Sequence, residues 1–548
     1  MKKALFALTV IVLIMTTVVS CNKTGGRSAD PNYPIEISVY VDAPGASRPT
    51  ATNKMYKYLQ DNLGVTFSWD ILVGDRAQKT GTMIAGGTYP DILNVNETTF
   101  IDAGALIPLE DLIAQYGPNI RAHYDSVWNK MKSPDGHTYY LMDYGVYNGQ
   151  DHNDFFNGSA FWVQKEVLKD AGYPKVVTVD QFFDMIANYY RRNPTIDGQP
   201  TIPFTVLTYD WRAFELWNPP NFLAGYPNEG NGIVDPVTHK YTNFFTHDIS
   251  RQWFRKLNEL DKQGLVERNG FTDNHDQYLA KIAAGRVLSL FGQQWQFDTS
   301  ENAKVERGLN SRTMAPLPIV FSENIRPRYR NLPIPNIGRG MGISVSAKDP
   351  VRIIRFLNDY LAEEVQRTVH WGIENEDWQY NEQGVPYRTE QQRTNWQAQS
   401  WQDQNRATLW SNLAPKNQGS FSDGYPTNLS LFYPEREAML KPEDRELYTA
   451  YGVTGYAELL DKNPPPNSLW FPTWSMPNPP DGSPAQMALD RCTQTMKRML
   501  PQMILAPTAD FDRLWDEYIR EMTVTNNIAV YEQYMQEQLN LRIAEWSR

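Results

Sequence analysis

Aromatic side chains in polar stretches are the residues of this chain best suited to hold a ligand. Phe, Trp and Tyr make up 13% of the sequence, and Trp295 and Trp371 each follow the end of a predicted element. Sugars stack their C–H faces on aromatic rings, while their hydroxyls pair with amides and carboxylates. The pattern predicts a carbohydrate site, and a packed core position is the alternative for each tryptophan. The aromatic candidates are Trp211, Trp217, Trp295, Trp371, Trp378 and Tyr147, and the polar candidates are Asn94, Asn96, Glu97, Asn148, Asn153, Gln293 and Glu374.

No catalytic signature stands out in the sequence. It contains no Gly-Lys pair, so no phosphate-binding loop of the Walker type is predicted. The seven histidines are scattered, with none at the spacing of a zinc site. A carboxylate pair for glycoside hydrolysis is defined by its distance in space, which leaves an enzyme acting on polysaccharides as an open alternative. We expect no catalytic residue, no metal and no cofactor.

The first part of the body reads as alternating strands and helices. Residues 35–41, 65–71 and 92–95 have the apolar patterns of strands, and helices are predicted between them. Met55, Leu59 and Leu63 mark the apolar face of the first of these helices. This order predicts an α/β fold with a mainly parallel sheet covered by helices.

Two later stretches carry candidate residues just beyond a predicted element. Residues 287–291 read as a buried strand, with Gln293 and Trp295 immediately after it. Residues 341–345 read as a strand, and one helix is predicted from Pro350 to Gly372, with Trp371 and Trp378 in or beside a polar loop. In α/β domains, loops that follow such elements present side chains to a cleft.

The N-terminus has the features of a lipoprotein signal peptide. Lys2 and Lys3 precede an uncharged, mostly apolar stretch, and Ser20-Cys21 ends it. A transmembrane anchor is the alternative, but a spanning helix needs about 20 apolar residues. We expect residues 1–20 to be removed, Cys21 to be lipidated and residues 21–33 to form a polar tether to the membrane.

The net charge and the cysteine content limit which partners and which cross-links the mature chain can have. Removal of the two lysines changes the formal charge from −11 to −13, because residues 1–20 contain no acid. This acidic balance argues against nucleic acid as a partner. Cys492 is the only other cysteine, so a mature chain with lipidated Cys21 contains no intramolecular disulfide.

Three short motifs resemble the extracellular solute-binding proteins of sugar-type ABC importers, in particular their large lipoprotein branch. They are Ile84-Ala85-Gly86-Gly87 through Asp91-Ile92-Leu93, Gly104-Ala105-Leu106-Ile107-Pro108-Leu109, and Gly372-Ile373-Glu374 through Trp378. Asn375 departs from the family glycine in the third motif, and Gln164 and Glu166 depart from a charged family sequence. The resemblance implies an oligosaccharide ligand, capture by hinge closure and delivery to ABC permease subunits.

The resemblance also implies a division of the chain into two lobes with multiple crossovers and a helical C-terminal region. Residues 34–148 and 314–370 would form the N-terminal lobe. Residues 149–313 and 371–548 would form the C-terminal lobe, with a third crossing at Trp371. Residues 379–484 are expected to be a looped, aromatic-rich insertion that packs against the second lobe.

Two alternatives remain open at this stage. Relatives often carry a calcium loop at the place of residues 193–199, but most of the alternating oxygen ligands are missing, so an ordinary turn is predicted. The alternatives to a transport protein are a surface polysaccharide-degrading enzyme and a glycan-binding surface lipoprotein without a transport role.

Overall fold

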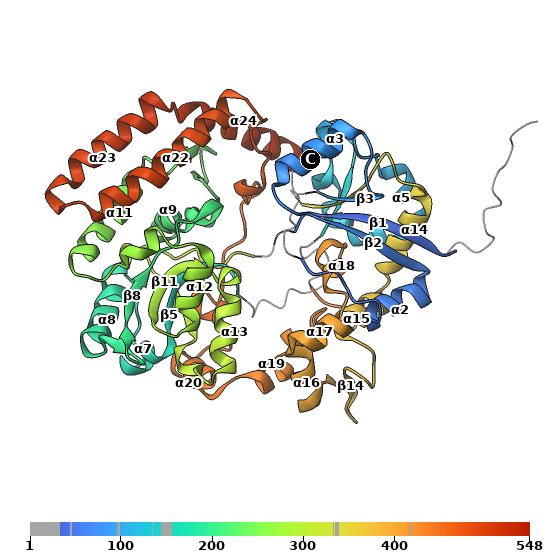
Figure 1. The fold of residues 1–548 in the computed structure, drawn as a ribbon, viewed down its shortest axis with the longest axis horizontal. Coiled ribbons are helices and arrows are strands. Elements are labelled where there is room, and N and C mark those ends of the chain that lie inside the picture. The colour runs from blue at the N-terminus through green and yellow to red at the C-terminus, as the bar shows by residue number, and fades with distance from the viewer. Residues whose placement is uncertain are drawn as a thin grey trace, which may run out of the picture.

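The computed structural model describes residues 33–43, 46–95, 99–133, 135–143, 156–332, 334, 339–416 and 419–547. Figure 1 shows two α/β lobes side by side, each built around its own sheet. The two-lobed α/β fold expected from the sequence is confirmed. Among the described residues, no helix combines the length and apolar content that a membrane-spanning segment needs.

The first lobe contains a five-stranded sheet in the order β2-β1-β3-β13-β4. Strands β1, β2 and β3 are parallel, as the alternating pattern predicts, and β13 runs antiparallel to β3 and β4. The elements of this lobe are β1 (Ile35–Val41), α2 (Lys54–Leu63), β2 (Val65–Ile71), α3 (Arg76–Gly86), β3 (Ile92–Val95), α4 (Thr99–Asp102), α5 (Glu110–Tyr116), α6 (Pro118–His123), the 3₁₀ helix η1 (Asp125–Met131), β4 (Tyr140–Met142), β13 (Gly340–Ile343), α14 (Pro350–Tyr360) and α15 (Glu363–Trp371).

Helix α2 shows how local sequence sets these elements. The Asn53 side chain accepts the backbone N–H groups of Met55 and Tyr56 and so caps the helix start. Gly64 ends the helix with a left-handed φ of 67°, a conformation that glycine adopts without steric cost. Met55 and Leu59 lie on the buried face, so the helix packs on the sheet.

The second lobe contains a four-stranded sheet in the order β12-β5-β11-β8. Its elements are β5 (Ser159–Gln164), α7 (Lys165–Asp170), α8 (Val179–Arg192), β6 (Thr195–Ile196), β7 (Gln199–Pro200), β8 (Ile202–Thr205), η2 (Asp210–Ala213), α9 (Phe214–Trp217), α10 (Pro219–Leu223), β9 (Gly232–Val234), β10 (Tyr241–Asn243), α11 (Asp248–Lys262), η3 (Arg268–Phe271), α12 (His275–Ala283), β11 (Val287–Gln293), η4 (Gln294–Gln296), α13 (Asp298–Glu306), η5 (Asn310–Arg312) and β12 (Met314–Leu317).

The rest of the chain is largely helical. It comprises β14 (Gln379–Tyr380), β15 (Pro386–Tyr387), α16 (Glu390–Gln397), α17 (Gln399–Asn405), α18 (Thr408–Leu413), η6 (Leu429–Leu431), α19 (Tyr433–Met439), α20 (Pro442–Tyr451), α21 (Tyr456–Leu460), η7 (Thr473–Ser475), α22 (Pro484–Leu505), η8 (Thr508–Asp510), α23 (Phe511–Arg520), the π-helical turn η9 (Glu521–Thr525) and α24 (Ala529–Trp546). Helices α22, α23 and α24 cover one end of the second lobe in Figure 1.

The strand β12 corrects the predicted boundary at residue 314. It pairs antiparallel with β5, Met314 opposite Gln164 and Leu317 opposite Phe161, and its side chains are buried in the core of the second lobe. The return to the first lobe therefore lies between Leu317 and Gly340. A strand of four residues has too little pattern of its own to reveal its sheet, because its pairing partner decides where it lies.

The third passage of the chain between the lobes was predicted at Trp371, but it lies later in the sequence. Trp410 of α18 packs in the core of the first lobe, with ring centroids 4.5 Å from Phe67 and 5.4 Å from Phe356. Leu447 of α20 lies in the core of the second lobe. The chain therefore crosses between Ala414 and Leu447. The predicted looped insertion is helical, and α16, α17 and α18 lie beside the first lobe in Figure 1 rather than on the second.

The single helix predicted from Pro350 to Gly372 is divided into α14 and α15. Ala362 has extended backbone angles (φ −59°, ψ 135°), which end the first helix and begin the second. The Gln366 side chain donates to the Tyr360 carbonyl at 2.8 Å and satisfies an acceptor at the end of α14. Both helices keep the predicted apolar face toward the sheet, since Ile354, Leu357 and Val365 are buried there.

Candidate functional site

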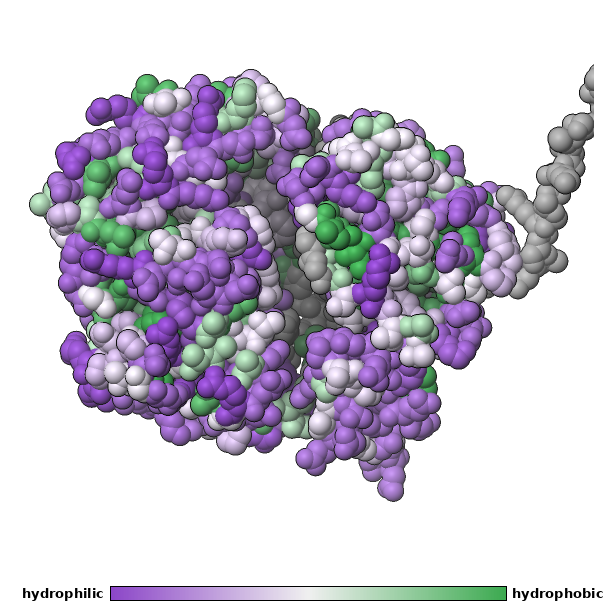
Figure 2. All heavy atoms as spheres, viewed as in Figure 1, coloured by the Kyte–Doolittle hydropathy of each residue, from purple (hydrophilic) through white to green (hydrophobic). Residues whose placement is uncertain are grey.

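The chain passes from one lobe to the other at one edge of each sheet, and these two edges border the space between the lobes. In the first sheet, Gly340 at the start of β13 pairs with Val95 at the end of β3 and with Met142 at the end of β4. In the second sheet, Ser159 at the start of β5 pairs with Gln293 at the end of β11. Because the chain passes from β4 to β5 and from β12 to β13, these edges face the other lobe. Figure 2 shows the surface hollowed between the lobes.

The groove edge of the first lobe carries a small cavity with a paired charge. Tyr40, Asp42, Arg76 and Asn94 line it, at the ends of β1 and β3 and the start of α3. Arg76 Nε lies 2.8 Å from Asp42 Oδ1, and the Arg76 side chain is half exposed. Burial, together with nearby Asp42, raises the pKa of the Tyr40 hydroxyl to about 12. The wall therefore presents neutral and paired polar groups.

Asn94 is the polar candidate that the structure brings to this cavity. Its amide nitrogen donates to the Gly340 carbonyl at 3.1 Å, which fixes the side chain across the neighbouring strand. Its Oδ1 is buried and has no hydrogen-bond partner among the described residues. A buried amide oxygen without a partner costs free energy, so Asn94 Oδ1 is an unsatisfied acceptor in the wall of this cavity.

The second lobe presents an aromatic platform made of Trp211 and Trp295. Their rings stack with centroids 6.0 Å apart and an angle of 14° between their planes. Trp211 is 58% exposed and Trp295 is 43% exposed, although burial of tryptophan is the norm. Phe214 extends the stack behind Trp211, with a centroid distance of 6.1 Å. Exposed, nearly parallel indole faces are the geometry on which sugar rings stack.

Polar side chains hold this platform in place. Trp295 Nε1 donates to Gln293 Oε1 at 2.5 Å, which fixes the indole relative to the end of β11. The Arg212 guanidinium lies 4.7 Å from the centre of the Trp211 ring and pairs with Asp210. The cation is therefore held over the ring face, and its charge is balanced within the same 3₁₀ helix.

A buried carboxyl group supports the end of β11 from behind. Glu215 Oε1 accepts the backbone N–H of Gln293 at 3.3 Å. Glu215 Oε2 is buried without a hydrogen-bond partner among the described residues. Burial raises the pKa of Glu215 well above its ordinary value, because desolvation disfavours the charged carboxylate.

Three predicted ligand tryptophans are buried. Trp371 is fully buried, donates from Nε1 to the Pro426 carbonyl at 3.1 Å and packs edge-on against Trp378 at 4.7 Å. Trp378 donates to the Gly372 carbonyl at 3.0 Å. Trp217 packs against Phe245 in the second core. The burial of Trp371 and Trp217 contradicts the expectation that they contact ligand, whereas Trp378 also lines a cavity, where it lies beside Glu374.

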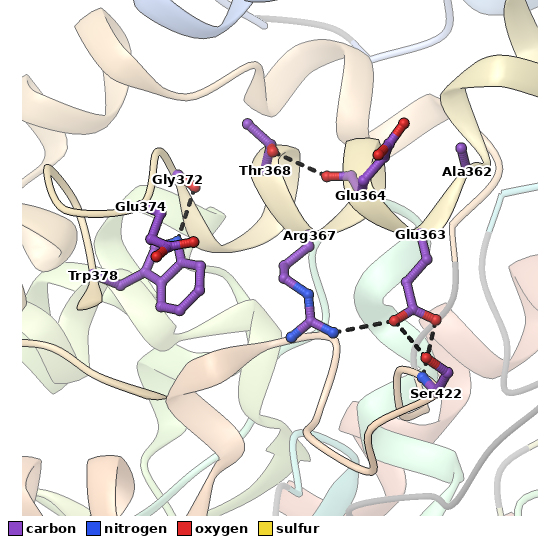
Figure 3. A pocket seen from close by; sticks show the side chains of 9 residues that line it. All are labelled: Ala362, Glu363, Glu364, Arg367, Thr368, Gly372, Glu374, Trp378 and Ser422. Atoms are coloured by element: carbon purple, nitrogen blue, oxygen red, sulfur yellow. Dashed lines mark hydrogen bonds and ion pairs between the residues drawn. The ribbon is translucent and has the colours of Figure 1, made fainter. Parts of the chain in front are cut away.

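Glu374 belongs to a different cavity, shown in Figure 3. This cavity has a volume of about 620 Å³ and is lined by α15, the turn after it and Ser422. Arg367 projects into it from α15 and pairs with Glu363 and Asp423. Asn375 takes a left-handed φ of 65° in the adjoining turn, so asparagine reproduces there the conformation that a family glycine would supply.

Of the remaining candidate site residues, some lie outside the part of the chain that the structure describes. Tyr147, Asn96, Glu97, Asn148 and Asn153 lie outside the described residues. Gln293 lies at the platform, as described above. The Asp42–Arg76 pair was missed by sequence reasoning. Asp42 could have been found because it follows β1 directly, whereas Arg76 opens α3 and has no sequence signal that links it to Asp42.

The stretch 193–199 forms a short hairpin. Strands β6 and β7 pair antiparallel, and Asp197 between them has a left-handed φ of 50°. Its carboxylate pairs with Arg312 at 2.5 Å. Across the described residues, no group of three or more His, Cys, Asp or Glu side chains is arranged to hold a metal ion.

Comparison with known proteins gives one sequence relative and many structural ones. The chain is 25% identical over 245 residues to the fructooligosaccharide ABC transporter substrate-binding protein FusA of Streptococcus pneumoniae serotype 4, covering 41% of this chain and 43% of that protein. The aligned part is therefore less than half the length of that relative.

The structural neighbours match almost the whole chain. The alginate-binding protein AlgQ2, solved without calcium ion, has a TM-score of 0.62 at 15% identity and covers 93% of this chain and 98% of its own. An extracellular solute-binding protein from Bifidobacterium longum subsp. infantis has a TM-score of 0.62 at 15% identity, with 92% and 98% covered. A FusA EF-hand mutant of S. pneumoniae in complex with fructo-nystose has a TM-score of 0.60 at 16% identity, with 93% and 100% covered. These likenesses concern the fold.

The family model of the bacterial extracellular solute-binding proteins matches residues 55–370, which is more than half of the chain. The matched stretch includes most of both sheets and the whole Trp211–Trp295 platform. The chain therefore belongs to the bacterial extracellular solute-binding proteins, and its place of action is outside the cytoplasm.

Proposed function

We propose that this protein captures an oligosaccharide in the groove between its lobes and delivers it to the permease of an ABC importer. The observation that carries the proposal is the pair of exposed, stacked indoles Trp211 and Trp295 at the groove edge of the second lobe. Two neighbouring aromatic faces suit a ligand of more than one sugar ring. The proteins similar to this chain include binding proteins for fructooligosaccharide and alginate, which supports the same ligand class here.

The two walls of the groove divide the recognition of such a ligand. The indoles would stack against the C–H faces of the sugar rings, and Gln293 lies beside them as an amide partner for hydroxyls. On the opposite wall, Asn94 and the Asp42–Arg76 pair offer acceptors and donors. A ligand that touches both walls binds the closed arrangement more tightly than the open one, so it shifts the population toward closure.

Calorimetric titration with defined oligosaccharides tests this proposal. Fructooligosaccharides and alginate oligosaccharides of increasing length are the first panel, with free monosaccharides as controls. One oligosaccharide bound per chain, with affinity increasing beyond the monosaccharide, is the expected result. Absence of binding to every sugar, together with tight binding of a peptide, would contradict the carbohydrate assignment.

We infer that the protein binds its ligand without changing it. The absence of a predicted nucleophile, metal set or phosphate loop in the sequence supports this inference. After prolonged incubation with a bound oligosaccharide, the sugar is expected to be recovered intact, without new reducing ends or unsaturated products. Sustained product formation that scales with protein concentration would favour the alternative of a polysaccharide-degrading enzyme.

The transport role needs its own test, because a glycan-binding surface lipoprotein would pass the binding experiments. Deletion of the chromosomal copy is expected to abolish uptake of the radiolabelled oligosaccharide, and the intact chain is expected to restore it. Normal uptake in the deletion strain, with loss of glycan adhesion, would indicate the non-transport role.

A further inference from the structure

The C-terminal helix α24 is anchored firmly in the second lobe. Its buried face includes Tyr531, Met535 and Leu539, which belong to the core of that lobe. Glu532 accepts the backbone N–H of Asn243 at 2.7 Å, so the helix is also tied to the β9–β10 ribbon. The second lobe therefore sets the position of α24.

Arg542 fixes the last turns of the helix to the same lobe. Its Nη1 donates to the Pro472 carbonyl at 2.6 Å and to Ser475 Oγ at 3.0 Å, and its Nη2 donates to the Ser475 carbonyl at 2.7 Å. The side chain is 5% exposed, and burial lowers its pKa to about 10. A buried, multiply bonded guanidinium of this kind holds the helix end in one position.

The tip of α24 reaches across to the first lobe. Trp546 lies under the ammonium group of Lys130 from η1, 4.7 Å from the ring centre. Arg542 lies at the same distance of 4.7 Å from this ring. Burial, with Arg542 nearby, lowers the pKa of Lys130, and the charge of Arg542 also acts on Tyr140 of β4. Helix α24 and η1 are in contact along this part of the first lobe.

We propose that α24 is a strap between the lobes, whose Trp546–Lys130 contact stabilises the arrangement of the lobes seen here. The contact lies outside the crossovers, so it can break and form again without any change in chain connectivity. It joins an element fixed in one lobe to an element fixed in the other, and any relative motion of the lobes must stretch or release it. The proposal goes beyond ligand capture and does not depend on the identity of the ligand.

The size of the effect follows from the contact itself. The free energy of a cation–π interaction at a partly exposed site corresponds to about a two- to fivefold change in the ratio of two populations. Loss of the contact is therefore expected to lower the ratio of this arrangement to all others by about that factor. The folds of the individual lobes should remain intact, because Lys130 and Trp546 are only partly buried.

Distance measurement between spin labels on the two lobes tests the proposal. The labels are placed at Val73→Cys in the first lobe and Asp184→Cys on α8, both of which are exposed. The full mature chain is used with Cys21→Ser, while Cys492 is buried and does not take a label. Pulsed dipolar spectroscopy on the ligand-free protein then gives the distribution of inter-lobe distances.

The variants Lys130→Ala and Trp546→Ala are compared with a matched control. In the control, Arg121→Ala removes a cation that lies 4.8 Å from the Trp128 ring within the first lobe. Both strap variants should lower the ratio of the main distance population to all other distances by the stated factor. The double variant should do no more than either alone, and the control should leave the ratio unchanged. A Lys130→Ala distribution identical to that of the parent chain would overturn the proposal, as would an equal change in the Arg121→Ala control.

Discussion

Trp211 and Trp295 lie nearly parallel, with their ring centroids 6.0 Å apart and 14° between the ring planes, although they follow different strands of the second sheet. Trp211 lies in η2 beyond β8, and Trp295 lies in η4 beyond β11, and these two strands are parallel neighbours. The carboxyl ends of parallel strands meet at one edge, so their loops are adjacent in space. The platform is therefore a direct consequence of sheet topology.

Trp371 is predicted to be a stability residue. Its indole is fully buried among Trp378, Phe421 and Leu429, so the Trp371→Ala variant should lose about 3–5 kcal/mol of unfolding free energy. Urea unfolding followed by circular dichroism measures this loss. The exposed Trp211→Ala variant serves as the control and should stay within about 0.5 kcal/mol of the parent chain. Equal stability of the two variants would show that the burial of Trp371 is not as described.

Glu215 is predicted to make stability depend on pH. Burial raises the pKa of Glu215 in the folded chain above its ordinary value of 4.5. At pH values between 4.5 and this raised pKa, the folded chain keeps a proton that the unfolded chain releases. Stability therefore falls as the pH rises through this window, and Glu215→Gln should remove that part of the fall.

The measurement is the difference in melting temperature between Glu215→Gln and the parent chain at a series of pH values above about 4.5. The variant should gain relative to the parent as the pH rises. The matched substitution Asp261→Asn should show no such gain over this series. Burial tends to raise the pKa of Asp261, but bonds to Arg268 and Lys262 hold it below its ordinary value of 3.8, so its titration lies below the pH values measured. A pH-independent difference for Glu215→Gln would contradict the prediction.

Cys21 is predicted to carry the lipid that anchors the mature chain. The charged start, the apolar stretch and Ser20-Cys21 are the basis for this prediction. Cells that express the parent chain should incorporate a palmitate analogue into it, and the protein should fractionate with membranes. The Cys21→Ala variant should do neither, and labelling of that variant would refute the assignment.

Sequence patterns predicted the regular elements better than the surroundings of single side chains. The alternation in residues 35–41 and the spacing of Met55 and Leu59 depend on neighbours in the chain, so strand β1 and helix α2 could be predicted. The burial of Trp371 depends on Phe421 and Pro426, which lie about fifty residues away and have no sequence signal that links them to it. The same limit applies to β12, whose place in the second sheet is decided by its pairing with β5.

At the site, sequence reasoning identified residues but not their groupings. Gln293 and Trp295 were predicted together after the strand at residues 287–291, but Trp211 was predicted apart from them, and the structure brings all three together on one wall of the groove. Asn94 was predicted as a polar partner, but its neighbours Asp42 and Arg76 were not. Their pairing needs the start of α3 to lie beside the end of β1, a relationship that appears only when the sheet is assembled.

The most direct test of the account is the affinity of Trp295→Ala for the oligosaccharide that the parent chain binds most tightly. Truncation of an aromatic anchor typically costs about 2 kcal/mol of binding free energy, which is about a thirtyfold loss of affinity. The account predicts this loss in calorimetric titration together with a nearly unchanged melting temperature, because the Trp295 side chain is 43% exposed. Unchanged affinity in Trp295→Ala, and likewise in Trp211→Ala, would contradict the assignment of the groove platform as the ligand site.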